Sequence, residues 1–270
     1  MKTRLITAAV LVPILLVIAF ALPTIVFAVA VALCCAIAAY ELLYGTGLVR
    51  HVRLVIYCVL TAALIPIWCY FEMPYVWGLL GLIVFVGALF AEMMYSHIKL
   101  QFERISVCIC AGILIPYLFS SVVRIHNYDL GRYIIIIPMI LAFLPDSGAY
   151  FCGLYFGKHK LAPAISPKKT VEGAIGGVIM GVLGMLLYGI IMQVAFRREV
   201  NYVFAVIYGL LGAAAAIFGD LCFSVIKRQS GIKDFGNLIP GHGGILDRFD
   251  SMIVVAPLTE VLLLLLPVVL

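Results

Sequence analysis

Charged residues are the scarcest component of this sequence. Asp, Glu, Lys and Arg make up 11% of the 270 residues, whereas apolar residues make up 65% and the mean hydropathy is +1.20. A chain with so little charge cannot cover a water-soluble fold with polar surface, so a soluble globular domain is excluded. We therefore expect an integral membrane protein.

Paired cysteines and polar linkers are also lacking. None of the eight cysteines has the spacing of a zinc site or a disulfide framework, and all lie in apolar stretches, so we interpret them as small buried thiols. We find no convincing repeat, low-complexity tract or soluble linker. The chain is interpreted as one membrane region in two parts: residues 1–132, which provide topology, packing and dimer contacts, and residues 133–270, which carry the motifs.

Long apolar runs recur along the whole chain. A membrane-spanning helix needs about 20 mainly apolar residues. Runs of this kind lie at about 5–21, 23–43, 54–71, 76–94, 105–123, 133–153, 171–195, 203–226 and 252–270. We therefore predict an all-α membrane protein with about nine transmembrane helices.

The basic residues predict how these helices are oriented. With a cytoplasmic N-terminus, 14 Lys and Arg fall on the cytoplasmic side and four on the other, as the positive-inside rule requires. Lys2 and Arg4 before a short apolar run also resemble a secretory signal, but the apolar sequence continues to Ala39, so we interpret this segment as an anchor. The net charge of +5 then reflects topology and affinity for anionic head groups or nucleotides, not nucleic-acid binding.

Acidic residues inside apolar stretches need a partner. Glu41, Glu92 and Glu103 stand near cytoplasmic helix ends, where we favour a structural role, with bracing of a site as the alternative. Asp146 lies in a proline-containing interruption of the sixth span, where an unpartnered carboxylate costs about 2.5–3.5 kcal/mol. We expect Asp146 to face a polar cavity; a hydrogen bond to a neighbouring helix is the alternative.

A lysine-rich segment precedes the seventh span. The lysines at 158 and 160 are equally well explained as a topogenic charge cluster. The sequence Ser166-Pro167-Lys168-Lys169-Thr170 predicts a turn before a helix N-terminus, where amides and lysines together favour a phosphate. Glycines 173, 177 and 181 in that helix predict close helix packing only.

The segment from 220 to 252 concentrates the polar chemistry. Asp220, Ser224 and Lys227 follow one helix face, and a buried Asp–Lys pair is the simpler explanation for them. Glycines 241, 243 and 244 permit positive φ and would leave backbone amides bare for a polyphosphate. Asp247 and Asp250, three residues apart, suit Mg²⁺ bound jointly with substrate phosphates.

These motifs resemble a known family signature. Over 27 positions the chain reads Ser224-x-x-Lys227-Arg228, four residues, Lys233-Asp234-x-Gly236, then Ile239-Pro240-x-His242-Gly243-Gly244-x-x-Asp247-Arg248-x-Asp250. This pattern is similar to that of the phosphatidate cytidylyltransferase (CDP-diacylglycerol synthase) family. The segments that begin at Asp146 and Ser166 also resemble family motifs, whereas the first 130 residues contain no motif that is specific to a family.

The resemblance implies a multi-pass, homodimeric enzyme of the bacterial inner membrane, with its site facing the cytoplasm. Its substrates would be CTP and phosphatidic acid, its products CDP-diacylglycerol and pyrophosphate, and its cofactor Mg²⁺, with a second cation, K⁺ or Mg²⁺, left open. A CTP-dependent kinase of a polyprenol or other lipid is the first alternative. A transporter is the second, although the acids gather at one surface and no matching halves are evident.

The resemblance also suggests roles for individual residues. As metal ligands we expect Asp220 and Asp247, with Asp250 and Asp146 as further ligands or their supports. Catalytic roles are expected for six residues: Asp220, Asp247, Asp250, Lys227, Arg248 and His242. His242 would either donate a hydrogen bond to the leaving group or shape the loop. Binding of nucleotide or lipid phosphate is expected of Ser166, Lys168, Lys169, Ser224, Arg228, Lys233, Asp234, Gly243 and Gly244.

Overall fold

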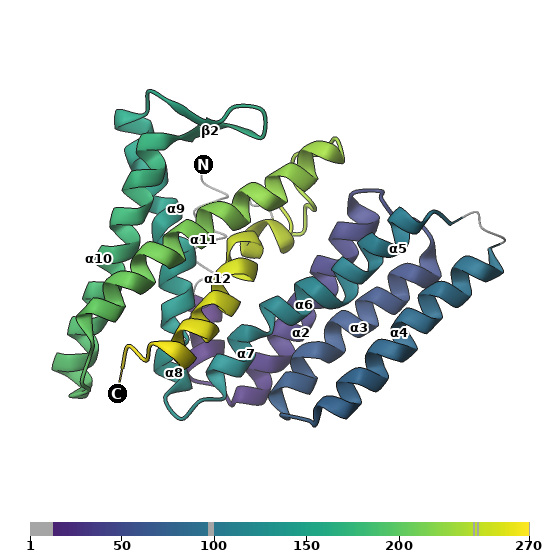
Figure 1. The fold of residues 1–270 in the computed structure, drawn as a ribbon, viewed down its shortest axis with the longest axis horizontal. Helices are drawn as coiled ribbons and strands as arrows, with labels where there is room; N and C mark the ends of the chain where they lie inside the picture. The colour runs from purple at the N-terminus through teal and green to yellow at the C-terminus, as the bar shows by residue number, and fades with distance from the viewer. Residues whose placement is uncertain (1–12, 97–99, 240, 242, 270) are drawn as a thin grey trace. The chain divides into compact units, whose positions relative to one another are not determined.

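The computed structural model describes residues 13–96, 100–239, 241 and 243–269 of the chain, and nearly all of its regular structure is helical (Figure 1). The chain divides into two units. The first combines Met1–Gly131 with Gln229–Phe249, and the second combines Arg132–Arg228 with Asp250–Leu270. The glycine-rich segment between the last two long helices therefore belongs with the N-terminal helices.

The first unit consists of apolar helices. A helix over residues 13–20 is followed by α2 (Thr24–Tyr40), the π-helical turn η1 (Glu41–Gly45), α3 (Val52–Tyr70), α4 (Tyr75–Tyr95), α5 (Phe102–Ile109), the π-helical turn η2 (Cys110–Leu114), α6 (Ile115–Phe119) and α7 (Ser121–His126). The main packing partner of α2 is α3, and α3 also contacts η2, α6 and α4. The run from α5 to α7 forms one apolar span of 25 residues.

The second unit carries a small sheet and the longest helices. After the short α8 (Gly131–Ile134), the elements are α9 (Ile136–Phe156), β1 (Lys160–Ala162), β2 (Ser166–Thr170), α10 (Val171–Phe196), α11 (Tyr202–Gln229) and α12 (Leu246–Leu265). The first four residues of α12 belong to the first unit and the remainder to the second. This one helix therefore carries Asp247 and Asp250 in consecutive turns.

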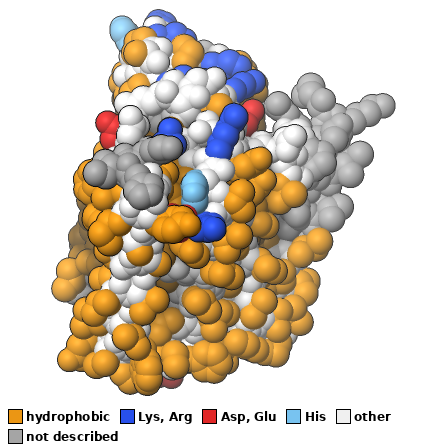
Figure 2. All heavy atoms as spheres, turned by 90° about the vertical axis from the view of Figure 1, so that its right-hand side faces the viewer, with side chains coloured by type: hydrophobic (Ala, Val, Ile, Leu, Met, Phe, Trp, Pro, Cys, Tyr) orange, Lys and Arg blue, Asp and Glu red, His pale blue; other side chains and the backbone are white. Residues whose placement is uncertain are grey.

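Seven helices of the described part of the chain are long and apolar enough to cross a membrane: Thr24–Gly45, Val52–Tyr70, Tyr75–Tyr95, Phe102–His126, Gly131–Phe156, Val171–Phe196 and Tyr202–Gln229. They match the second to eighth predicted spans. Large apolar side chains are exposed along them, and hydrophobic side chains dominate the face seen in Figure 2. The protein is therefore a multi-pass, predominantly α-helical membrane protein.

The two terminal spans have different outcomes. Residues 5–12 of the predicted span 5–21 lie outside the described part of the chain, and the described residues 13–20 of that span form a helix. The predicted span 252–270 has the wrong limits, because the helix begins at Leu246 and ends at Leu265. Its first two turns contain Asp247, Arg248 and Asp250, so a search for apolar runs places the start of α12 too late.

The expected interruption of the sixth span is also wrong. Helix α9 continues through Pro145 without a break. A proline removes only one backbone hydrogen bond, and close packing against α10 supports the helix around it. A Cβ on Gly177 would lie 2.9 Å from the Pro145 carbonyl oxygen, so the glycines of α10 do serve close packing, as predicted.

The segment before α10 is a β-hairpin and not the predicted turn. Strand β2 pairs antiparallel with β1, with Lys160 opposite Thr170 and Ala162 opposite Ser166. The Thr170 hydroxyl oxygen accepts a hydrogen bond of 3.1 Å from the Gly173 N–H and so caps α10. The hairpin thus carries Lys168 and Lys169 directly to this helix N-terminus.

The packing of α9 against α10 generates a prediction. A Cβ added at Gly176 would overlap the Cβ and Sγ atoms of Cys152 on α9. We expect Gly176→Ala to lower the free energy of unfolding by about 1–3 kcal/mol, because overpacking forces side chains and backbone apart. Thermal unfolding of the purified protein in detergent measures the effect.

The matched control is Gly81→Ala on α4, where an added Cβ would meet nothing within 4 Å. This variant should unfold at the wild-type temperature or slightly above it, because alanine favours a helix over glycine. Equal stabilities for the two alanine variants would contradict the packing argument.

Candidate functional site

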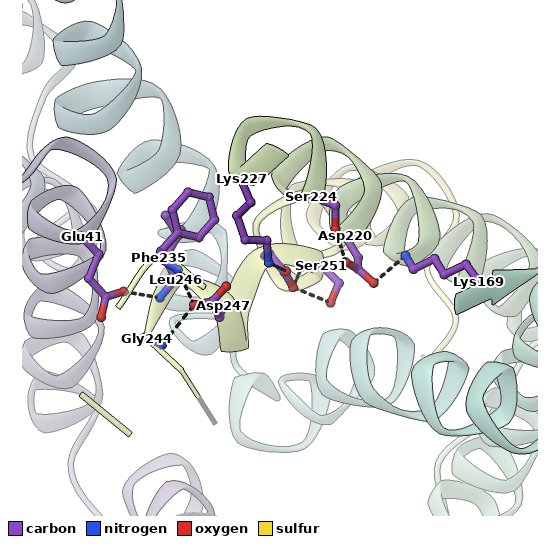
Figure 3. Close-up of polar contacts among 11 residues, drawn as sticks. Glu41, Lys169, Asp220, Ser224, Lys227, Phe235, Gly244, Leu246, Asp247 and Ser251 are labelled. Carbon is purple, nitrogen blue, oxygen red and sulfur yellow. Dashed lines mark hydrogen bonds and ion pairs between the residues drawn. The ribbon is translucent and has the colours of Figure 1, made fainter. Parts of the chain in front are cut away.

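The polar residues of the motifs form one cluster in each unit. In the first unit, the carboxylates of Glu41 and Asp247 accept hydrogen bonds from the backbone at residues 235 and 244–246. Figure 3 shows those from residues 235, 244 and 246. In the second unit, Lys169, Asp220, Ser224, Lys227 and Asp250 form ion pairs and hydrogen bonds. We call these the Asp247 cluster and the Asp220 cluster.

Asp247 is buried in the first turn of α12, with 6% of its surface exposed. Its Oδ2 atom accepts hydrogen bonds from the N–H groups of Phe235, at 2.8 Å, and Gly244, at 3.0 Å. The bond back to Gly244, three residues earlier, resembles half of a capping box. The carboxylate therefore closes the glycine-rich segment onto the start of its own helix.

Glu41 caps the same helix from a distant part of the sequence. It begins η1 and is 5% exposed. Its Oε1 atom accepts from the Ile245 N–H at 3.0 Å, and its Oε2 atom accepts from the Leu246 N–H at 2.9 Å. The first N–H groups of a helix have no partner within the helix, so Glu41 provides the acceptors that α12 lacks.

The glycines of this segment have two different roles. Gly241 and Gly243 have φ of 79° and 83°, as predicted, and the Ile239 N–H donates to the Gly243 carbonyl at 2.9 Å across the turn. Gly244 is needed for space, because a Cβ there would overlap the Glu41 carboxylate. Its N–H is bonded to Asp247, so the expectation of a bare amide at Gly244 is wrong.

Asp220 lies on α11 and contacts two polar side chains. Lys169 Nζ lies 2.5 Å from its Oδ2 atom, and the Ser224 hydroxyl donates to its Oδ1 atom at 3.1 Å (Figure 3). The predicted shared face of Asp220 and Ser224 is confirmed. The side chains of Lys169 and Asp220 are 24% and 25% exposed, so solvent reaches this pair.

A second ion pair joins α11 to α12. Lys227 Nζ lies 3.7 Å from Asp250 Oδ2, and these side chains are only 11% and 10% exposed. Asp250 Oδ1 also accepts from the Ser251 N–H at 2.8 Å. The sequence suggested an ion pair between Asp220 and Lys227, and this pairing is wrong. Asp220 pairs with Lys169, and Lys227 pairs with Asp250.

The remaining predicted residues lie around these clusters. The Arg228 Nε–H donates to the Ile165 carbonyl oxygen between the hairpin strands at 3.1 Å. Ser166 is partly buried on β2. Five of the predicted site residues are exposed: Asp146, Lys168, Lys233, Asp234 and Arg248. His242 lies outside the described residues.

The acids suit a hard divalent cation by their chemistry. Within the described part of the chain, no three or more His, Cys, Asp or Glu side chains gather into a group that could hold a metal. However, Mg²⁺ is usually bound by one or two carboxylates together with substrate phosphates and water. Asp247 and Asp250, in consecutive turns of α12, are donors that fit this mode.

Glu41 has partners that the sequence does not reveal. Its hydrogen bonds from the Ile245 and Leu246 N–H groups confirm the structural role, whereas bracing of a functional site stays a prediction. The available signal was an acid ending an apolar run, but its partners lie about 200 residues further on. Of the other two acids near helix ends, Glu92 is buried and its Oε1 atom lies 3.3 Å from Arg53 Nη1. Glu103 is exposed.

Comparison with known proteins gives a consistent result. The model of the cytidylyltransferase family matches residues 2–266. The phosphatidate cytidylyltransferase of Pseudomonas aeruginosa is 34% identical over 97% of each chain. The phosphatidate cytidylyltransferase of Bacillus subtilis is 39% identical over 60% of this chain and 59% of its own length. That of Haemophilus influenzae is 39% identical over 53% of this chain and 52% of its own length. The matched region thus spans about three fifths or less of these last two relatives.

The buried pair of Lys227 and Asp250 generates a prediction about stability. We expect Lys227→Met to lower the free energy of unfolding by about 3–5 kcal/mol, because Asp250 then stays charged in a site with little water. Chemical unfolding of the purified protein in detergent measures the loss.

A double-mutant cycle provides the control. Adding Asp250→Asn to Lys227→Met should recover much of the lost stability, since neither charge then remains buried without the other. Strictly additive losses for the two substitutions would show that the pair is not coupled.

Proposed function

The chain belongs to the cytidylyltransferase family, and we propose that it transfers the cytidylyl group of CTP to phosphatidic acid, which gives CDP-diacylglycerol and pyrophosphate. The observation that carries the proposal is the extent of the family match. It runs over residues 2–266 and so includes every member of the Asp247 and Asp220 clusters. In the Asp220 cluster carboxylates lie beside lysines, and this chemistry suits a reaction between two phosphates.

The proposed reaction needs no covalent enzyme intermediate. A phosphate oxygen of phosphatidic acid attacks the α-phosphorus of CTP in line and forms the new P–O bond. The bond from that phosphorus to the oxygen bridging to the β-phosphate breaks, and its electron pair leaves with pyrophosphate. The protein then contributes positioning and neutralisation of charge, which are the main sources of catalysis in such transfers.

Basic residues would bind the phosphates. Lys169 belongs to the Asp220 cluster and follows the exposed Lys168 on the hairpin before α10. We assign these two to the triphosphate or the lipid phosphate, and Ser166 and Ser224 to supporting hydrogen bonds. Further phosphate contacts are assigned to Lys227, Arg228, Lys233 and Arg248, with Asp234, Gly243 and Gly244 shaping the segment between α11 and α12.

We propose Mg²⁺ as the cofactor, with a second cation, K⁺ or Mg²⁺, as an open addition. Asp220 and Asp247 would be the principal ligands, and Asp250 and Asp146 further ligands or their supports. Bound there, the cation would neutralise charge on the phosphates of CTP. His242 is proposed either to donate a hydrogen bond to the leaving pyrophosphate or to shape the loop.

The membrane placement is also a proposal. The surplus of basic residues in alternate loops favours a cytoplasmic N-terminus and a site that faces the cytoplasm. The bacterial relatives favour the inner membrane, where phosphatidic acid would reach the site from the lipid phase. The proposed assembly is a homodimer.

The test uses the purified protein in detergent with phosphatidic acid and Mg²⁺. CTP labelled at the α-phosphorus is compared with CTP labelled at the γ-phosphorus, and label is counted in the lipid extract. We expect α-label only, dependent on phosphatidic acid. Transfer of γ-label would indicate a lipid kinase, and no label from either nucleotide would favour a transporter.

Two substitutions test the carboxylates. Asp220→Ala and Asp247→Ala should each lower cytidylyl transfer by more than about a hundredfold, because even partners outside the ligand set of a metal contribute about 10–100-fold. Transfer is measured with α-labelled CTP on protein that elutes as wild type in size exclusion. Asp129→Ala, at an exposed position in the first unit, is the control and should keep wild-type transfer. Substantial turnover by either test variant would contradict the assignment.

A further inference from the structure

The N-terminal helices contribute an acid to the motif segment. Glu41 opens η1, a π-helical turn in which the Thr46 N–H donates to the Glu41 carbonyl at 3.2 Å. Short π-helical turns within α-helical runs occur frequently at functional sites. Here the turn follows α2 directly, in a part of the chain whose sequence otherwise carries no motif.

Glu41 and Asp247 divide consecutive backbone donors between them. The Gly244 N–H donates to Asp247 and the Leu246 N–H donates to Glu41 (Figure 3). The Ile245 N–H between them also donates to Glu41. Because Asp247 is only one residue beyond Leu246, the bonds to Glu41 fix the backbone that orients the Asp247 side chain. Both oxygens of Glu41 are used as acceptors.

The surrounding residues fit a carboxylate at this place. A Cβ at Gly236 or at Gly244 would overlap a Glu41 carboxylate oxygen. Likewise, a Cβ at Gly45 would overlap the Phe235 carbonyl oxygen, so η1 and the segment before Asp247 touch through backbone. Glycine at these three positions brings the motif segment directly onto the turn that carries Glu41.

We propose that Glu41 is a positioning residue for the transfer reaction: it holds the N-terminus of α12 so that Asp247 keeps the orientation needed to act on the metal-bound nucleotide. This role rests on the function proposed above. Glu41 itself is 5% exposed, and both of its carboxylate oxygens accept hydrogen bonds from backbone N–H groups. In this role it acts through Asp247 and does not contact substrate.

The test compares Glu41→Gln with Glu92→Gln. Glutamine has the size of glutamate but only one acceptor oxygen, so at position 41 its NH₂ group would face one of the two backbone N–H donors. Glu92 is a matched control: it is also buried, at 8% exposure, in the first unit, but it contacts Arg53 and His51. Glu41→Asp, which keeps two acceptors on a shorter side chain, is the conservative variant.

Activity and loop structure are measured on monodisperse protein in detergent. For Glu41→Gln we expect kcat/KM about 10–100-fold below that of Glu92→Gln and a higher half-activating Mg²⁺ concentration, with Glu41→Asp intermediate. A second readout is independent of turnover: the rate of trypsin cleavage after Lys233, an exposed residue in the segment between α11 and α12. This rate should rise in Glu41→Gln and stay unchanged in Glu92→Gln.

The outcomes separate the two proposals. Equal kcat/KM and Mg²⁺ requirement in the two glutamine variants would overturn the positioning role, even with faster cleavage. A fall in kcat/KM without a changed Mg²⁺ requirement or faster cleavage would overturn it as well. If wild type transfers no α-label, the proposed function fails, and the cleavage rate alone then decides whether Glu41 holds the segment.

Discussion

Four backbone N–H groups around the start of α12 need acceptors, and two carboxylates supply them. The donors are those of residues 235, 244, 245 and 246, and the acceptors are Asp247 and Glu41. An unsatisfied N–H in a buried place costs about 1–3 kcal/mol, so this arrangement is a strong constraint on the segment. It explains why the described residues 244–246 are fixed at the start of α12, and why a buried acid occupies the second residue of that helix.

In the second unit, the charged groups at the ends of apolar helices are stabilised by ion pairs. Lys227 and Asp250 are almost enclosed and neutralise each other between α11 and α12. Lys169 reaches Asp220 from the hairpin, where the capped start of α10 fixes the strand that carries it. Close packing of α9 and α10 through their glycines holds this hairpin and its helix in place. The apolar framework therefore determines where the ionised groups can meet.

The sequence predicts what depends on local pattern and misses what depends on distant partners. Seven spans follow from apolar length alone, and the i, i+4 spacing of Asp220 and Ser224 correctly predicts their contact. The strand at Ser166–Thr170 could not be predicted, because its hydrogen bonds come from β1 and not from its own composition. The same holds for Glu41, whose two donors are more than 200 residues away. Partner choice among several lysines and acids is likewise a property of the packed helices.

The pairing of Lys169 with Asp220 has a consequence for what the site can bind. Both side chains are about one quarter exposed, so each depends partly on the other for neutralisation. An anion that draws Lys169 away leaves Asp220 without its cation, and a cation that draws Asp220 away leaves Lys169 without its anion. Either change by itself gives up a charge pair, and at this exposure water compensates the loss only in part. A ligand that brings both charges at once, such as a nucleotide phosphate carrying a divalent cation, satisfies both groups together. Under the proposed function, the ion pair would therefore favour joint binding of metal and nucleotide over binding of either one alone.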